Sequence, residues 1–184
     1  MSSTDQSAFA CLDYTDDTKA RFYQSLRKAS NQFGCRYVSY VYENNGVRIG
    51  FTSNPDWQRE YIDNHMIDHC HLWNTVSRYF LDTKRSSLIL PWDTAKPNDK
   101  HQKDIILCRD EMDIGRNGIS FCTQTEGKRE FLAFAPDLRE PNFAYHLMNN
   151  LESVRDIAGI FRSASQQAVT NKEEHVSGQA HHQR

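Results

Sequence analysis

Residues 35–52 of this chain predict a β-hairpin, and that hairpin limits the folds open to the rest of the sequence. The segment CRYVSYVYE (Cys35–Glu43) is rich in valine and tyrosine, which are favoured in strands. It runs through Asn44–Gly46 into VRIGFT, and asparagine and glycine tolerate the positive φ angles of a tight turn. Later in the chain, ISFCTQT meets REFLAFA across residues 126–127, which predicts a second hairpin. Hairpins favour antiparallel pairing, so an antiparallel sheet is expected.

Apolar residues recur at helical spacing in the segments around these strands. Asn54-Pro55 reads as an N-cap followed by proline at the first helical position. We expect helices over 16–32, from Asn54, over 67–80, after a cap at Asn98, and from Asn142 to Phe161, with a further strand over 86–92. This order predicts an α/β (α+β) fold, a PAS/GAF-like α-β-α sandwich with a five-stranded antiparallel sheet. Such a sandwich leaves space between sheet and helices, where small molecules bind.

Length and composition indicate one soluble domain. The 184 residues suffice for a single core, and we expect an N-terminal arm over 1–14, a sensor domain over 15–162 and a flexible polar tail over 163–184. A net charge of −2 offers no basic stripe for direct nucleic-acid binding. Neither a secretory signal nor a membrane-spanning run is visible. Five scattered cysteines fit free thiols in a reducing cytoplasm, which predicts a cytoplasmic protein.

Four motifs follow one another in a characteristic order. They are NPDWxxxY (Asn54–Tyr61), ILPW (Ile89–Trp92), IGRNGIS (Ile114–Ser120) and the turn into EFLAFA. Together they resemble the autoinducer-binding domain of LuxR-type transcriptional regulators, over roughly residues 18–162. The resemblance implies a non-enzymatic sensor without a cofactor, which binds a small apolar signal such as an acyl-homoserine lactone. Too few residues follow Arg162 for the family's helix-turn-helix domain, so we expect an orphan variant without it.

The resemblance also assigns ligand-binding residues. Trp57 would donate its indole N–H to a lactone carbonyl, Tyr61 would wall the acyl chain, and Trp92 would pack against the ligand head. Asp68 is the candidate for the family's carboxylate, which accepts the ligand amide N–H. Ala133 stands where the family often carries a serine or threonine facing the ligand.

Three positions depart from the family pattern. The family commonly has Asp-Pro about nine residues after the tyrosine, whereas Asp68 follows Tyr61 by seven. Ser53 replaces a tyrosine found in many members, and Ala133 lacks the hydroxyl. These departures motivate an alternative, in which the fold is kept as a protein-interaction module and its own side chains fill the pocket.

A third hypothesis is a small metal- or thiol-dependent enzyme. His65 and His69 are four residues apart, a spacing that can hold zinc from one helix face. The HExxH motif is absent, no distant ligand set stands out, and no local signature marks Cys70, Cys108 or Cys122 as a nucleophile. We therefore expect neither a metal site nor catalytic residues.

The predicted C-terminal helix carries an apolar stripe from Phe143 to Phe161. The stripe is expected to pack on the sheet, and any part beyond what the sheet covers could form a dimer seam. The partner would be a second copy of this chain or a full-length LuxR-type regulator.

Overall fold

The computed structural model describes residues 16–45, 47–136 and 140–180, so the predicted N-terminal arm lies outside the described residues. In chain order the elements are α1 (Asp16–Phe33), β1 (Cys35–Asn44), β2 (Val47–Thr52), α2 (Pro55–Asp63), α3 (Met66–His69), α4 (His71–Thr83), β3 (Ser87–Pro91), the 3₁₀ turn η1 (Trp92–Thr94), α5 (Lys100–Glu111), β4 (Ile119–Thr125), β5 (Lys128–Pro136), α6 (Phe143–Met148) and α7 (Leu151–Ala180). No described helix is both long enough and apolar enough to span a membrane.

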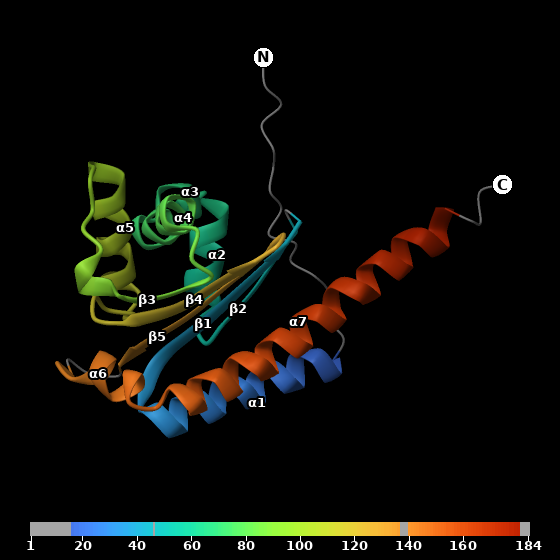
Figure 1. The fold of residues 1–184 in the computed structure, drawn as a ribbon, viewed down its shortest axis with the longest axis horizontal. Coiled ribbons are helices and arrows are strands. Elements are labelled where there is room, and N and C mark those ends of the chain that lie inside the picture. The colour runs from blue at the N-terminus through green and yellow to red at the C-terminus, as the bar shows by residue number, and fades with distance from the viewer. Residues whose placement is uncertain (1–15, 46, 137–139, 181–184) are drawn as a thin grey trace, which may run out of the picture.

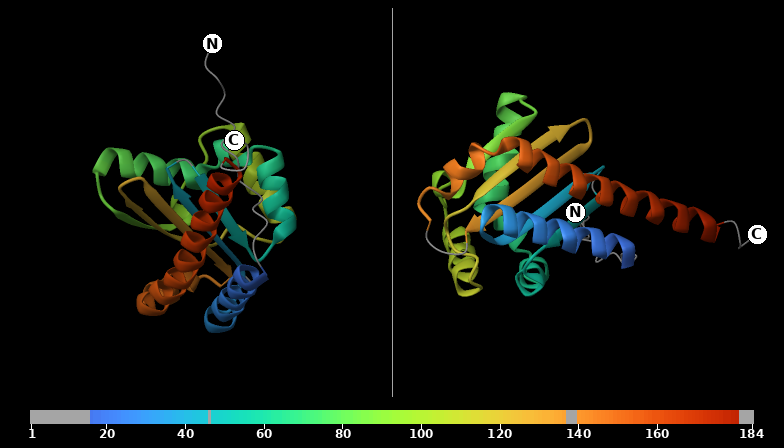
Figure 2. Two further views of the ribbon diagram at one scale, coloured as in Figure 1. Left: turned by 90° about the vertical axis from the view of Figure 1, so that its right-hand side faces the viewer. Right: turned by 90° about the horizontal axis from the view of Figure 1, so that it is seen from below.

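The strands form one antiparallel sheet in the order β2-β1-β5-β4-β3. Both predicted hairpins are present, and β1 pairs with β5 to join them at the centre of the sheet. Helices α1 and α7 lie side by side on one face, and α2 to α5 cover the other (Figures 1 and 2). The predicted fold class, a five-stranded antiparallel sheet between two helical layers, is confirmed.

Two hydrophobic cores lie on opposite faces of the sheet, because side chains alternate along each strand. On β5, Leu132 and Phe134 belong to the core beneath α1 and α7. Phe131, Ala133 and Ala135 belong to the core beneath α2 to α5.

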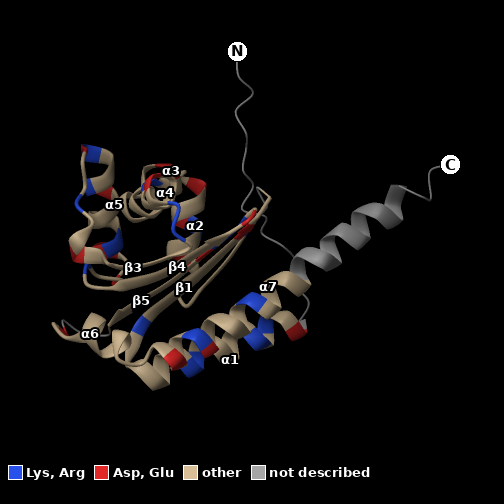
Figure 3. Ribbon diagram, in the orientation of Figure 1, with Lys and Arg blue, Asp and Glu red and all other residues tan. Residues whose placement is uncertain are grey.

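Figure 3 shows acidic and basic residues interspersed along α1 and the described part of α7.

Helix starts follow the sequence closely, with one correction. The Asn54 side chain accepts a hydrogen bond from the Trp57 N–H (3.0 Å), with Pro55 at the first helical position, as predicted. Helix α5 is capped by Asp99, whose carboxylate accepts from the Gln102 N–H (2.9 Å), and not by Asn98. The backbone N–H of Asn98 instead donates to the Gln102 side chain, which leaves Asp99 in the cap position.

Two predicted helices are each divided in the structure. The stretch 67–80 is interrupted at Cys70, whose extended backbone separates α3 from α4. The helix predicted from Asn142 is divided at Asn149 and Asn150 into α6 and α7. Helix α7 also continues beyond Arg162 to Ala180, so part of the predicted flexible tail is helical.

Candidate functional site

A pocket lies between the sheet and the α2 to α5 layer. It encloses about 660 Å³ of space, counted out to the open solvent at its mouth. Its walls are rich in aromatic residues and come from β1, β2 and β5 of the sheet, from α2 to α5, and from η1. Six aromatic residues both line the pocket and pack in the core beneath α2 to α5: Tyr37, Trp57, Tyr61, Trp73, Trp92 and Phe131. An apolar recess of this kind is suited to the body of a small organic ligand.

Trp57 and Tyr61 reach the pocket from consecutive turns of α2. The Asn54 cap fixes the start of the helix, and residues four apart lie on the same helical face. Their ring centroids are 5.3 Å apart, and both side chains line the pocket. The structure therefore brings these two predicted residues together in one wall.

Trp92 lies at the end of β3 and forms another wall. Its indole N–H donates to the buried Ser120 hydroxyl on β4 (2.8 Å), and this bond fixes the ring plane. Its ring lies so close to Gly118 that a Cβ there would stand 2.5 Å from a ring carbon. This close approach requires glycine at 118. Glycine is favoured at 115 for a different reason, because the backbone there has a positive φ of 80°.

Ala133 lines the pocket at the centre of the sheet. It pairs in register with Ser39 on β1 and with Ser120 on β4. Neighbouring residues in register share a sheet face, so hydroxyl groups flank Ala133 on both sides. Ala133 lacks a hydroxyl, but Ser39 on the neighbouring strand β1 has one and also lines the pocket.

Asp68 does not belong to this pocket. Its side chain is exposed on the short helix α3, and it is absent from the described lining residues. The residue nine positions after Tyr61 is Cys70, which is buried and does line the pocket. No aspartate or glutamate is present among the described lining residues.

Arg109 is a buried cation in the pocket wall, on α5. Its guanidinium carbon lies 4.8 Å from the Trp92 ring centre, and its Nη2 atom lies 4.0 Å from Cys70 Sγ. Burial raises the pKa of Tyr61 well above its usual value, and the neighbouring Cys70 adds to this effect. The Arg109 charge acts to lower the pKa of Tyr61. Because each of these groups affects the same hydroxyl, Tyr61, Cys70 and Arg109 form one polar cluster.

His71 adjoins this cluster at the start of α4. The side chain is buried, and its Nδ1 atom has no hydrogen-bond partner among the described residues. Burial, reinforced by the charge of Arg109, lowers the pKa of His71 to about 4. The imidazole is therefore neutral near pH 7 and adds no second positive charge beside Arg109.

The histidines considered as metal ligands are arranged differently. His65 has a left-handed backbone between α2 and α3, and the His69 ring stacks on His101 at 5.2 Å. Within the described ranges, no group of three or more histidine, cysteine, aspartate or glutamate side chains is placed to hold a metal ion.

Sequence reasoning missed Tyr37, Cys70, Trp73, Arg109 and Phe131 as pocket residues. Two of them carried a usable signal. Counting nine residues from Tyr61 leads to Cys70, and Arg109 follows Gln102 and Ile105 at the spacing of one buried helix face. The remaining three depend on strand register and on the division of α3 from α4.

Solved structures share this fold. Escherichia coli SdiA superposes with a TM-score of 0.56 and 12% identity, over 85% of this chain and 62% of the SdiA chain. CepR2 from Burkholderia cenocepacia, described as an N-acylhomoserine lactone dependent LuxR-family transcription factor, gives a TM-score of 0.47 and 12% identity, over 86% of this chain and 97% of its own. The chain matches no protein-family model and no curated protein sequence. The SdiA match shows that the two proteins share a fold, in agreement with the α-β-α sandwich that the sequence predicted.

Proposed function

We propose that this domain is a non-enzymatic sensor that binds a small molecule with a largely apolar body in the pocket between the sheet and α2 to α5. The observation that carries the proposal is the pocket itself, an aromatic-lined recess between the sheet and the helices α2 to α5. Trp57, Tyr61 and Trp92, the residues to which the LuxR-type resemblance assigns ligand contacts, line this pocket and support the proposal. The fold shared with SdiA supports this proposal.

The proposed ligand differs from an acyl-homoserine lactone in its polar group. The resemblance assigns a carboxylate to the lactone's amide N–H, and Asp68 is too exposed to supply it. Cys70 stands at the pocket instead, and a thiol is a weaker acceptor than a carboxylate. Acyl-homoserine lactones remain the first molecules to test, because their acyl chains suit the aromatic walls.

Ligand binding would stabilise the folded state by mass action. The pocket is lined from both the sheet and the helical layer, so its occupant would tie the two together. We propose that the signal then passes to a partner chain in the cytoplasm, either a second copy or a LuxR-type regulator. The domain would in this way act on transcription without contacting DNA.

Two alternatives receive less support. A pocket filled by its own side chains would leave no recess lined by Ala133. A thiol-dependent enzyme needs a readily ionised cysteine, whereas burial raises the pKa of both Cys108 and Cys122.

A thermal-shift titration tests the proposed function. The probes are acyl-homoserine lactones of several chain lengths, together with octanamide and octanoate. Ligand at about 100 times its dissociation constant adds about 2.7 kcal/mol of stability, which is an easily measured shift. Ala133→Leu, which places a larger side chain in the pocket, should abolish the shift. Ala20→Leu on the exposed face of α1 should retain it. Equal shifts in both variants would place binding elsewhere and contradict the proposal.

A further inference from the structure

Among the residues that the structure describes, none supplies a counter-charge to Arg109 in the pocket. The residue is 5% exposed, yet it is one of the lining residues. Its contacts are the Trp92 ring face and the Cys70 sulfur. Across the described ranges, the aspartates and glutamates that form ion pairs are paired with arginines other than Arg109. His71, whose pKa the Arg109 charge helps to lower, is neutral near pH 7 and adds no charge to the site.

A buried, unpaired guanidinium is unfavourable for the empty domain. Arginine stays charged in proteins and presents five N–H donors in a planar fork. A cation–π contact and a weak thiol acceptor replace only part of the hydration that these donors lose. Such a group is stable at low cost only if an anion pairs with it.

The surroundings of Arg109 offer further donors to an anion. Tyr37 and Tyr61 line the same pocket, and their hydroxyls lie close enough to interact electrostatically with Arg109. Most of the remaining lining is apolar, with Trp57 and Phe131 in the walls. The pocket thus combines one cationic point with a long aromatic recess.

We infer that the ligand of this pocket carries a carboxylate, which binds the Arg109 guanidinium while an apolar body lies against the aromatic walls. This inference rests on the proposed function, because it names the chemical class of that ligand. Two parallel N–H donors of arginine match the two oxygens of a carboxylate. A phosphate monoester, with its greater charge, would call for a second cation, and Arg109 is the sole arginine or lysine among the described lining residues.

Intrinsic fluorescence provides the assay, because all three tryptophans of the chain line the pocket. Octanoate and 3-phenylpropanoate are titrated against octanamide and 3-phenylpropanamide, which match them in shape and lack the charge. The wild-type protein should bind each acid at least about 10-fold more tightly than its amide. Equal affinity for acid and amide would overturn the inference, whatever the variants do.

Arg109→Met should weaken binding of the acids by about 10- to 100-fold and leave amide affinity nearly unchanged. Lys103→Met is the matched control, because it removes a charge from the exposed face of the same helix and should change neither affinity. Without ligand, Arg109→Met should unfold at the same or a higher temperature than the wild type, since a buried unpaired charge is lost. Unchanged acid affinity in a folded Arg109→Met protein would contradict the inference.

The two proposals fail in different ways. Binding of amides or lactones without any preference for acids contradicts the carboxylate and leaves the sensor function intact. If no acid, amide or lactone alters the tryptophan fluorescence, the proposed function itself is contradicted.

Discussion

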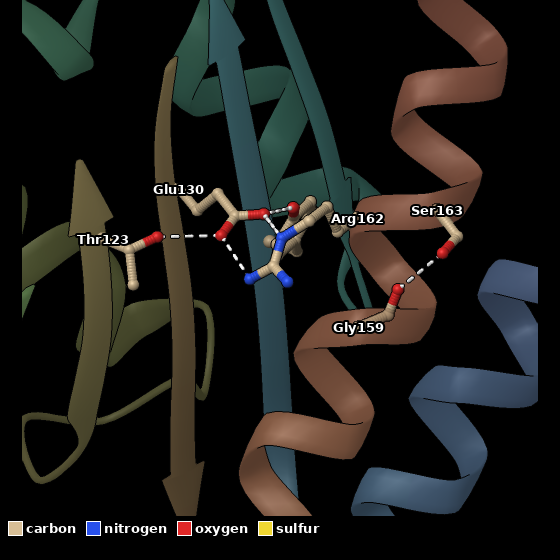
Figure 4. A network of polar contacts seen from close by, with 6 residues as sticks. Thr123, Glu130, Gly159, Arg162 and Ser163 are labelled. Atoms are coloured by element: carbon tan, nitrogen blue, oxygen red, sulfur yellow. Dashed lines mark hydrogen bonds and ion pairs between the residues drawn. The ribbon is translucent and has the colours of Figure 1, made fainter. Parts of the chain in front are cut away.

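Arg162 on α7 and Glu130 on β5 form a two-pronged ion pair, with Nε–Oε1 and Nη2–Oε2 distances of 2.6 and 2.7 Å. The Tyr40 hydroxyl also donates to this carboxylate. The Thr123 hydroxyl donates to it from β4 (Figure 4). Burial acts to raise the pKa of Glu130, but these hydrogen bonds and the Arg162 charge outweigh it and lower the pKa. The long helix is thereby joined to the sheet face opposite the pocket.

Arg162→Met should destabilise the domain by about 1–2 kcal/mol. The cost of breaking a buried pair is reduced here because the Arg162 side chain is 44% exposed. A carboxylate with a lowered pKa adds stability above its usual value of 4.5 and loses it as the pH falls through the folded-state pKa. Removal of Arg162 should therefore move acid unfolding to higher pH. Urea unfolding from pH 7 to 3 checks this, and the exposed Arg155→Met serves as control. Identical acid-unfolding profiles for the two variants would contradict the assigned pairing.

His71 should make the domain sensitive to mild acid. Its pKa is about 4 in the folded state against 6.5 ordinarily, so the unfolded chain takes up the proton first as the pH falls. Its contribution is complete above about pH 6.5 and declines toward pH 4, by roughly 2–3 kcal/mol in all. His71→Gln should flatten the stability profile between pH 7 and 4.5. An unchanged slope in His71→Gln would refute the assignment.

Gly118→Ala should destabilise the domain by about 1–3 kcal/mol, because the added Cβ would collide with the Trp92 ring and with the Phe134 carbonyl oxygen at 2.7 Å. The displaced ring should also alter the tryptophan emission. Gly159→Ala on α7 has no heavy atom within 4 Å of its new Cβ and should stabilise the protein by about 0.5–1 kcal/mol. Chemical denaturation of both variants measures this difference in sign, and a neutral Gly118→Ala would show that Trp92 is free to move.

Cys70→Asp should change the ligand preference of the pocket. A carboxylate at this position would lie beside Arg109, pair with it, and compete with an acidic ligand. Binding of octanoate should fall about 10-fold or more, while an acyl-homoserine lactone gains an acceptor for its amide N–H. Cys70→Asn has nearly the same shape without the charge and serves as control. Equal octanoate affinities in the two variants, measured by fluorescence titration, would contradict the role of charge.

The hairpins and most helices were predictable because their signals are local. The signals for the β1–β2 pairing and for the Asn54 cap act within a few residues, and the structure agrees with both. Divisions within the helical stretches were missed because neither Cys70 nor Asn149-Asn150 belongs to a strong helix-breaking class. Asp99 replaced Asn98 as the cap, because two adjacent residues of equal capping propensity are separated only by tertiary packing.

The pocket was predictable in its aromatic walls and not in its charge. Trp57, Tyr61, Trp92 and Ala133 all line it, since helix phase and strand alternation determine their faces. Asp68 was chosen for its residue type, and the short helix α3 turns it to solvent. Arg109 is not predicted as a pocket residue because arginine is seldom buried. Its burial depends on the packing of α5 against Trp92, which is a tertiary contact.

The most direct test of a ligand pocket on the α2 to α5 face is a two-dimensional ¹H–¹⁵N spectrum recorded during titration with octanoate, octanamide and an acyl-homoserine lactone. We predict that at least one probe shifts the indole signals of Trp57, Trp73 and Trp92 together with the amide signal of Ala133. Amide signals of Ala29 and Ile157, in the core beneath α1 and α7, should move little. Indole signals that stay fixed with every probe, or shifts confined to α1 and α7, would contradict this prediction.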